Sequence, residues 1–175
     1  MSRCQTVVWI LGDQLDHDHP ALQQALAEDG PEALYVLLIE SRQRLHKRPY
    51  QRKKLVLLLS AMRHFADELC QKGIQVEYTK LDNAENQHSL TGELLRKIRQ
   101  LDCKNVIVTE PGEYRVLEMM HAWPQQLDIS LEIESQAPRS LADYQVFSEE
   151  VVFSRIREAK SAFGEALVIL GHHYQ

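Results

Sequence analysis

Short apolar runs alternate with longer amphipathic stretches as far as Glu134, and this alternation constrains the fold more than any other feature. Such alternation is typical of a parallel sheet whose strands are joined by crossover helices. The predicted strands are Thr6–Leu11, Ala33–Ile39, Gln75–Lys80, Asn105–Thr109 and Ile129–Glu134. The predicted helices are Pro20–Glu28, Gln51–Lys72, Ser89–Leu101 and Glu113–Gln126. We therefore predict an α/β fold with an open, doubly wound, mainly parallel five-stranded sheet and helices on both faces.

The predicted strands are of two kinds. Thr6–Leu11, Ala33–Ile39 and Asn105–Thr109 are apolar nearly throughout, as expected of strands that are covered on both faces. Gln75–Lys80 and Ile129–Glu134 alternate between apolar and polar residues, which predicts that they lie at the edges of the sheet. In such a sheet, ligands bind at the carboxyl ends of the strands, near the topological switch point.

Polar residues follow three of these strands. Gly12, Asp13 and Gln14 come after the first strand, Glu40 after the second and Glu110 after the fourth. The first turn contains neither the GxGxxG dinucleotide fingerprint nor a phosphate-binding P-loop. Two interpretations stay open: the glycine relieves a tight turn while the carboxylates cap or end their elements, or these groups converge on a ligand.

Residues 42–54 (RQRLHKRPYQRKK) form the one strongly basic run of the chain. One interpretation is a binding site for a phosphate or another anion, and the other is a solvated loop that leads into a first helical turn. Lys53 and Lys54 lie at the start of a predicted helix, where positive charge opposes the helix dipole. This placement favours a compensating anion or carboxylate nearby.

Composition narrows the classes of function. The formal net charge of −5 argues against binding nucleic acid by bulk electrostatics, so we expect no strong nucleic-acid binding by the chain alone. Cys4, Cys70 and Cys103 are far apart, which predicts neither disulfides nor a zinc site. Because no apolar stretch approaches the ~18 residues of a membrane span, we expect a cytoplasmic protein without membrane association. No spacing predicts a catalytic or metal-ligating residue.

The character of the sequence changes after residue 135. Residues 136–150 contain a proline and several polar residues without a clear period, which predicts a linker. Residues 151–175 are predicted to form a helix and a strand. The expected organisation is therefore an α/β domain at 1–135, a linker at 136–150 and a tail at 151–175.

Four segments resemble one known family, the deoxyribodipyrimidine photolyase-related flavoproteins. They are ILGDQL at 10–15, RPYQRKKLVLLLSAMRHFADEL at 48–69, HSLTGEL at 88–94 and VTEPGEYRVL at 108–117. The resemblance covers residues 5–134 and implies a Rossmann-like antenna domain. In that family a helical domain follows, which carries FAD and in many members an iron–sulfur cluster, and light captured by the antenna drives repair of ultraviolet DNA lesions.

The resemblance also implies a ligand and a set of pocket residues. The ligand is a small aromatic antenna chromophore, similar to 6,7-dimethyl-8-ribityllumazine or to a flavin. The implied cofactor-binding residues are Gly12, Asp13, Gln14 and Glu40, with Lys53, Lys54 and Glu110 as further candidates.

The chain departs from the family after Glu134. No WAxxRK…MExFYR-like continuation follows and no cysteine comes after Cys103, so FAD and the cluster are expected only in the missing domain. Residues 152–175 instead resemble the opening of quinolinate synthases, with His173 and Tyr174 at substrate-contacting positions, which suggests a fused, frameshifted or truncated reading frame. We expect the chain alone not to act as a photolyase. The alternatives are an interaction module that docks on a separately encoded flavin domain, and a small-metabolite binding protein.

Overall fold

Five parallel strands form the centre of the structure, a computed structural model that describes residues 5–46 and 50–135. The strands are β1 (Thr6–Trp9), β2 (Leu34–Ile39), β3 (Gln75–Thr79), β4 (Asn105–Thr109) and β5 (Ser130–Glu134). The helices are α1 (Pro20–Glu28), α2 (Arg42–His46), α3 (Arg52–Gln71), α4 (Leu90–Leu101) and α5 (Tyr114–Leu127). The predicted Rossmann-like α/β fold is confirmed, and the strand boundaries differ from the predicted ones by at most two residues.

The strand order is β3-β2-β1-β4-β5, and every neighbouring pair is parallel. The chain builds outward from β1 to β3 and then returns to the other side of β1 for β4 and β5. The topological switch point therefore lies between β1 and β4. The two alternating strands, β3 and β5, are the edges of the sheet, as their sequence pattern predicts.

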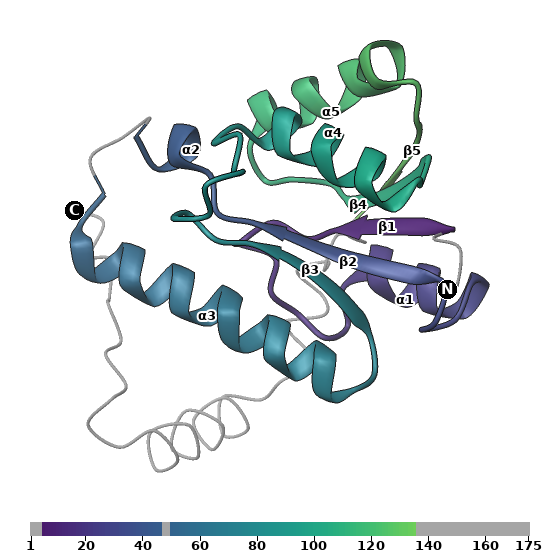
Figure 1. Ribbon diagram of the computed structural model, residues 1–175, viewed down its shortest axis with the longest axis horizontal. Helices are drawn as coiled ribbons and strands as arrows, with labels where there is room; N and C mark the ends of the chain where they lie inside the picture. The colour runs from purple at the N-terminus through teal and green to yellow at the C-terminus, as the bar shows by residue number, and fades with distance from the viewer. Residues whose placement is uncertain (1–4, 47–49, 136–175) are drawn as a thin grey trace, which may run out of the picture. The chain divides into compact units, whose positions relative to one another are not determined.

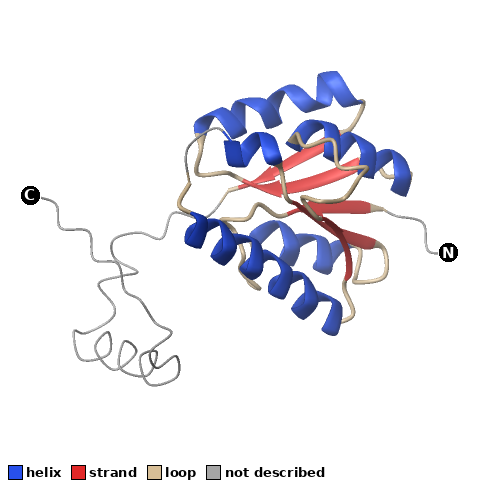
Figure 2. Cartoon of the chain, turned by 60° about the vertical axis from the view of Figure 1, so that its left-hand side comes forward, coloured by secondary structure: helices blue, strands red, loops and turns tan. Residues whose placement is uncertain are grey.

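Helices cover both faces of the sheet (Figures 1 and 2). In β1 and directly after it, Val7 and Trp9 belong to the core under α4 and α5, whereas Val8 and Ile10 belong to the core under α1 and α3. Successive side chains of a strand point to opposite faces, so a central strand needs apolar residues at every position. This requirement explains the continuous apolar run at the start of the chain.

The longest helix, α3, changes character along its length. Its second half buries Met62, Phe65 and Leu69 against the sheet at three and four residue spacing. Its first half leaves Val56 and Leu57 with 68% and 70% of their surface exposed. The first half of the helix therefore carries apolar side chains that lie on its exposed surface and do not pack in the core.

The short helix α2 occupies the start of the basic run, where one of the two interpretations had a solvated loop. Its five residues are too few to show a helical period, so the sequence pattern did not reveal it. The hydroxyl oxygen of Ser41 accepts a hydrogen bond from the Arg44 amide at 3.4 Å, and the Gln43 amide donates to the His88 carbonyl at 3.0 Å. These contacts hold α2 across the carboxyl end of β2.

No helix within residues 5–46 and 50–135 is long and apolar enough to cross a membrane. The division of the chain at residue 135 stays a prediction. The linker at 136–150 and the tail at 151–175, including His173 and Tyr174, lie outside the described residues.

Candidate functional site

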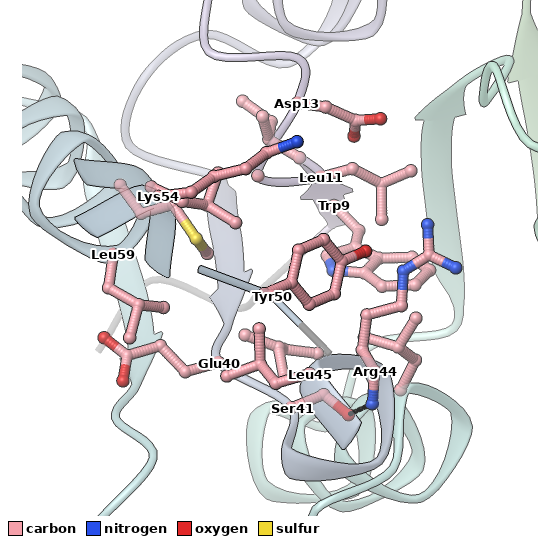
Figure 3. Close-up of a pocket in the computed structure, with 16 residues that line it drawn as sticks. Trp9, Leu11, Asp13, Glu40, Ser41, Arg44, Leu45, Tyr50, Lys54 and Leu59 are labelled. Carbon is pink, nitrogen blue, oxygen red and sulfur yellow. Dashed lines mark hydrogen bonds between the residues drawn. The ribbon is translucent and has the colours of Figure 1, made fainter. Parts of the chain in front are cut away.

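A pocket of about 260 Å³ lies at the carboxyl ends of β1 and β2, between α2 and α3 (Figure 3). Its apolar lining consists of Trp9, Ile10, Leu11, Ile39, Leu45, Leu58, Leu59, Met62 and Leu90. Its other lining residues are Gly12, Asp13, Glu40, Ser41, Arg44, Tyr50 and Lys54. A mainly apolar cavity with a few polar groups is typical of sites for small organic ligands.

The pocket lies on the β2 side of β1, away from the switch point. At the switch point, the Gln14 side-chain amide donates hydrogen bonds to the carbonyls of Thr109 at 3.3 Å and Glu110 at 3.0 Å. Gln14 is only 8% exposed and joins the loop after β1 to the end of β4. A protein side chain thus bridges the two strand ends between which a ligand was expected.

His19 completes a buried polar cluster beside Gln14. Its ring is 1% exposed, and its Nδ1 lies 3.2 Å from the Thr109 hydroxyl oxygen. Burial lowers the pKa of His19 from 6.5 to about 4, against a smaller opposite effect of the Asp16 carboxylate. The imidazole is therefore neutral in the folded protein at neutral pH.

Gly12 allows the turn after β1 to approach α3 closely. A Cβ atom at this position would lie 2.9 Å from the Met62 sulfur, which is closer than ordinary packing permits. The sulfur would have to move, and Met62 itself lines the pocket. The size of residue 12 therefore controls the shape of the cavity.

Glu40 contributes to the pocket wall, but its carboxylate is engaged elsewhere. It accepts hydrogen bonds from Arg63 at 2.8 and 3.1 Å, from the Tyr78 hydroxyl at 2.7 Å and from the Leu81 amide at 2.7 Å. Burial alone would raise the pKa of the Glu40 carboxyl, but these hydrogen bonds outweigh it and hold the pKa below its usual value. In Figure 3 the carboxylate points away from Tyr50. Glu40 therefore joins β2 to α3 and to the β3 end.

Besides Glu40, the charged side chains around the pocket are Asp13, Arg44 and Lys54 (Figure 3). The Lys54 ammonium lies 5.7 Å from the centre of the Tyr50 ring, within the range of a cation–π contact. Arg44 forms an ion pair of 2.5 Å with Glu113, the residue before α5. These groups give an otherwise apolar cavity a charged rim.

The sequence-predicted site residues separate into two groups. Gly12, Asp13, Glu40 and Lys54 line the pocket. Gln14, Lys53 and Glu110 are not among its lining residues: Gln14 is hydrogen bonded at the switch point, and Lys53 and Glu110 are exposed. The Glu110 amide donates to the Glu134 carbonyl at 2.8 Å, which fixes the ends of β4 and β5 together.

Sequence reasoning missed Trp9 and Met62 as pocket residues, and it considered Arg44 only as part of the basic run at 42–54, for which an anion site was one interpretation. The signal for Met62 was its spacing, because Lys54, Leu58 and Met62 recur every four residues and lie on one face of α3. Trp9 has two roles: it packs with its ring centre 5.0 Å from that of Trp123, and it also lines the pocket.

Comparison with known proteins gives two findings. Residues 8–149 match the family described as deoxyribodipyrimidine photo-lyase-related protein. The chain is also 38% identical over 129 residues to a protein of Agrobacterium fabrum (strain C58) named "(6-4) photolyase". This similarity covers 74% of the chain and 25% of the relative, so the chain spans about a quarter of the length of that protein.

Proposed function

We propose, from the premise that this chain belongs to the deoxyribodipyrimidine photolyase-related protein family, that its pocket binds a small aromatic antenna chromophore. The expected ligand class is a ribityllumazine or a flavin. The observation that carries the proposal is the mainly apolar pocket at the ends of β1 and β2, which has the aromatic residues Trp9 and Tyr50 in its lining. Aromatic side chains favour offset-stacked or edge contacts with a planar ring.

The polar groups of the pocket suit the edges of such a ring system. Lumazines and flavins carry carbonyl oxygens and ring nitrogens that accept hydrogen bonds, together with an N–H group that donates one. Lys54 and Arg44 are donors, and Asp13 is an acceptor. The apolar residues of α3 would exclude water from the ring faces, and the polar rim would fix its orientation.

We assign light collection, and not lesion repair, to the described residues. Repair requires a flavin held against a flipped lesion, and the cofactor performs that chemistry. We propose that this flavin, and any iron–sulfur cluster, belongs to the remaining part of a complete photolyase. DNA repair by this chain as the only protein, with FAD and blue light supplied, would contradict this assignment.

The test of the antenna proposal is a titration of the purified chain with 6,7-dimethyl-8-ribityllumazine and with riboflavin, followed by ligand absorbance and fluorescence. We expect a spectral shift that saturates at micromolar concentrations. Gly12→Val should abolish it, because the added side chain would clash with Met62 and both residues line the pocket. Gly112→Val is the matched control, since a Cβ there meets no atom within 4 Å. Absence of any shift with the unmodified chain would refute ligand binding.

A second candidate function is docking on a separately encoded helical flavin domain. The exposed Val56 and Leu57 of α3 favour it, because apolar side chains exposed together often mark interaction surfaces. The test is co-purification of this chain with the flavin-binding part of the Agrobacterium relative. Val56→Glu with Leu57→Glu should abolish co-purification, while a charge at the exposed polar Ser60 should not. Equal effects of both changes would refute a specific apolar contact.

A further inference from the structure

We infer that the pocket continues past Arg44 into a second cavity that binds a phosphate group, so that the preferred ligand is an aromatic ring system with a phosphorylated side chain. This inference rests on the proposed function, because the ring would occupy the pocket described above. It goes beyond that function because it specifies a negatively charged ligand. Neither the family match nor the relative's name specifies a ligand charge.

The two cavities share a wall. The second cavity has a volume of about 100 Å³ and lies between α2, the start of α4 and the first turns of α5. Ser41, Arg44 and Leu90 line both cavities, so the two cavities lie next to each other at these residues. The first cavity, at about 260 Å³, is small for a ligand site, since such sites usually measure ~300–1,000 Å³. A ligand that extends past Arg44 would use both spaces.

The lining of the combined site carries surplus positive charge. Its cationic residues are Arg44, Lys54 and Arg115, whereas its anionic residues are Asp13 and Glu40. The Glu40 carboxylate is paired with Arg63, and Arg44 is paired in the same way with Glu113; both partners lie outside the two cavities. Lys54 and Arg115 then remain against Asp13, which is a surplus of one positive charge. The chain as a whole has a formal charge of −5, so this positive region is local and not a general property of the surface. An anionic group is therefore attracted to this place specifically.

The arginines supply the donors that a phosphate needs. Arg44 uses Nη1 to contact Glu113, and a guanidinium has five N–H donors in all. The pair with Glu113 also restrains the Arg44 side chain, which reduces the entropy lost when a ligand binds. Arg115 lines the second cavity from the first turn of α5. Charge-assisted hydrogen bonds from two guanidinium groups are a common way to bind phosphate.

The competing explanation is that the second cavity accepts only an uncharged hydroxylated chain. Three probes separate the two explanations because they share one ring system: lumichrome has no long side chain, riboflavin has a ribityl chain, and flavin mononucleotide has the same chain with a phosphate. A phosphate site predicts the strongest binding for flavin mononucleotide. A polyol site predicts equal binding of riboflavin and flavin mononucleotide, both above lumichrome.

The experiment measures the dissociation constants of the three probes by fluorescence for the unmodified chain, Arg115→Gln and Lys53→Gln. We expect flavin mononucleotide to bind about tenfold more tightly than riboflavin at low ionic strength, with a smaller ratio in high salt. Arg115→Gln should reduce this ratio severalfold, because flavin mononucleotide loses more affinity than riboflavin when the guanidinium is removed. Lys53→Gln removes the same charge from an exposed residue outside both cavities, and it should preserve the ratio.

The outcomes distinguish this inference from the function on which it rests. Equal affinities for riboflavin and flavin mononucleotide would overturn the phosphate site and support the antenna pocket. Equal losses in Arg115→Gln and Lys53→Gln would also overturn it, because bulk charge would then explain the preference. Absence of binding by all three probes would overturn both proposals.

Discussion

The buried histidine at the switch point makes the stability of the fold depend on pH. His19 is 1% exposed and contacts the Thr109 hydroxyl, and its pKa falls from 6.5 to about 4 because burial disfavours the charged ring. In the unfolded chain the same ring titrates near 6.5. Between these two values the unfolded chain binds a proton that the folded chain does not bind. The free energy of unfolding therefore decreases as the pH falls through this range.

The size of the effect follows from the two pKa values. The difference between 6.5 and about 4 corresponds to a total of about 3 kcal/mol. The contribution is complete above the unfolded pKa and is lost below the folded one. At about pH 5 roughly 2 kcal/mol has already been lost, which is a large part of the stability of an ordinary domain.

Urea denaturation at about pH 7.5 and about pH 5 measures this loss. His19→Asn removes the ionisation and keeps a polar atom near the position of Nδ1. The variant should be less stable than the unmodified chain at the higher pH, but its free energy of unfolding should change by about 2 kcal/mol less between the two conditions. His121→Asn, at an exposed position, is the matched control and should retain the full difference. If His19→Asn shows the same pH dependence as the unmodified chain, the reasoning is refuted.

Three further predictions concern particular contacts. Glu40→Ala should lower the free energy of unfolding by about 2–3 kcal/mol in urea titrations, because the Tyr78 hydroxyl and the Leu81 amide lose their acceptor, while the half-exposed Arg63 regains water. Trp123→Ala should cost about 3–5 kcal/mol, since the fully buried ring packs on Trp9, and a loss below 1 kcal/mol would show that the core refills the space. Asp102→Gly should raise the melting temperature, because Asp102 ends α4 at φ 50°, where glycine avoids a strain of about 1 kcal/mol; a lower melting temperature would contradict this explanation.

The strands could be predicted from the sequence because the apolar pattern of each strand reflects which of its two faces are buried. The central strands β1, β2 and β4 need apolar residues at every position, and the edge strands β3 and β5 need them at alternate positions. The helix α2 could not be predicted in this way. Contacts distant in sequence hold it in place, above all those with the His88 carbonyl, and no local period reports them.

The candidate site was predicted less completely than the fold. The position of Gly12 and Asp13 followed from the rule that loops at the carboxyl ends of parallel strands form sites. The orientation of Glu40 depends on Arg63 and Tyr78, which come from α3 and β3, so no pattern around residue 40 reveals that its carboxylate turns away from the pocket. Strand-end position predicts that a residue is near a site, and tertiary partners decide whether its side chain is available.

Tertiary contacts of the strand-end residues also explain where the pocket lies. In a doubly wound sheet the crevice between β1 and β4 is the usual place for a ligand, but Gln14 bridges these strand ends here and His19 packs beside it on Thr109. On the other side of β1, Gly12 has no side chain, and the Glu40 side chain is drawn toward Arg63 on α3. Space therefore remains at the ends of β1 and β2, and α2 and α3 enclose it. The residues at positions 12, 14, 19 and 40 thus determine which crevice of the sheet stays open.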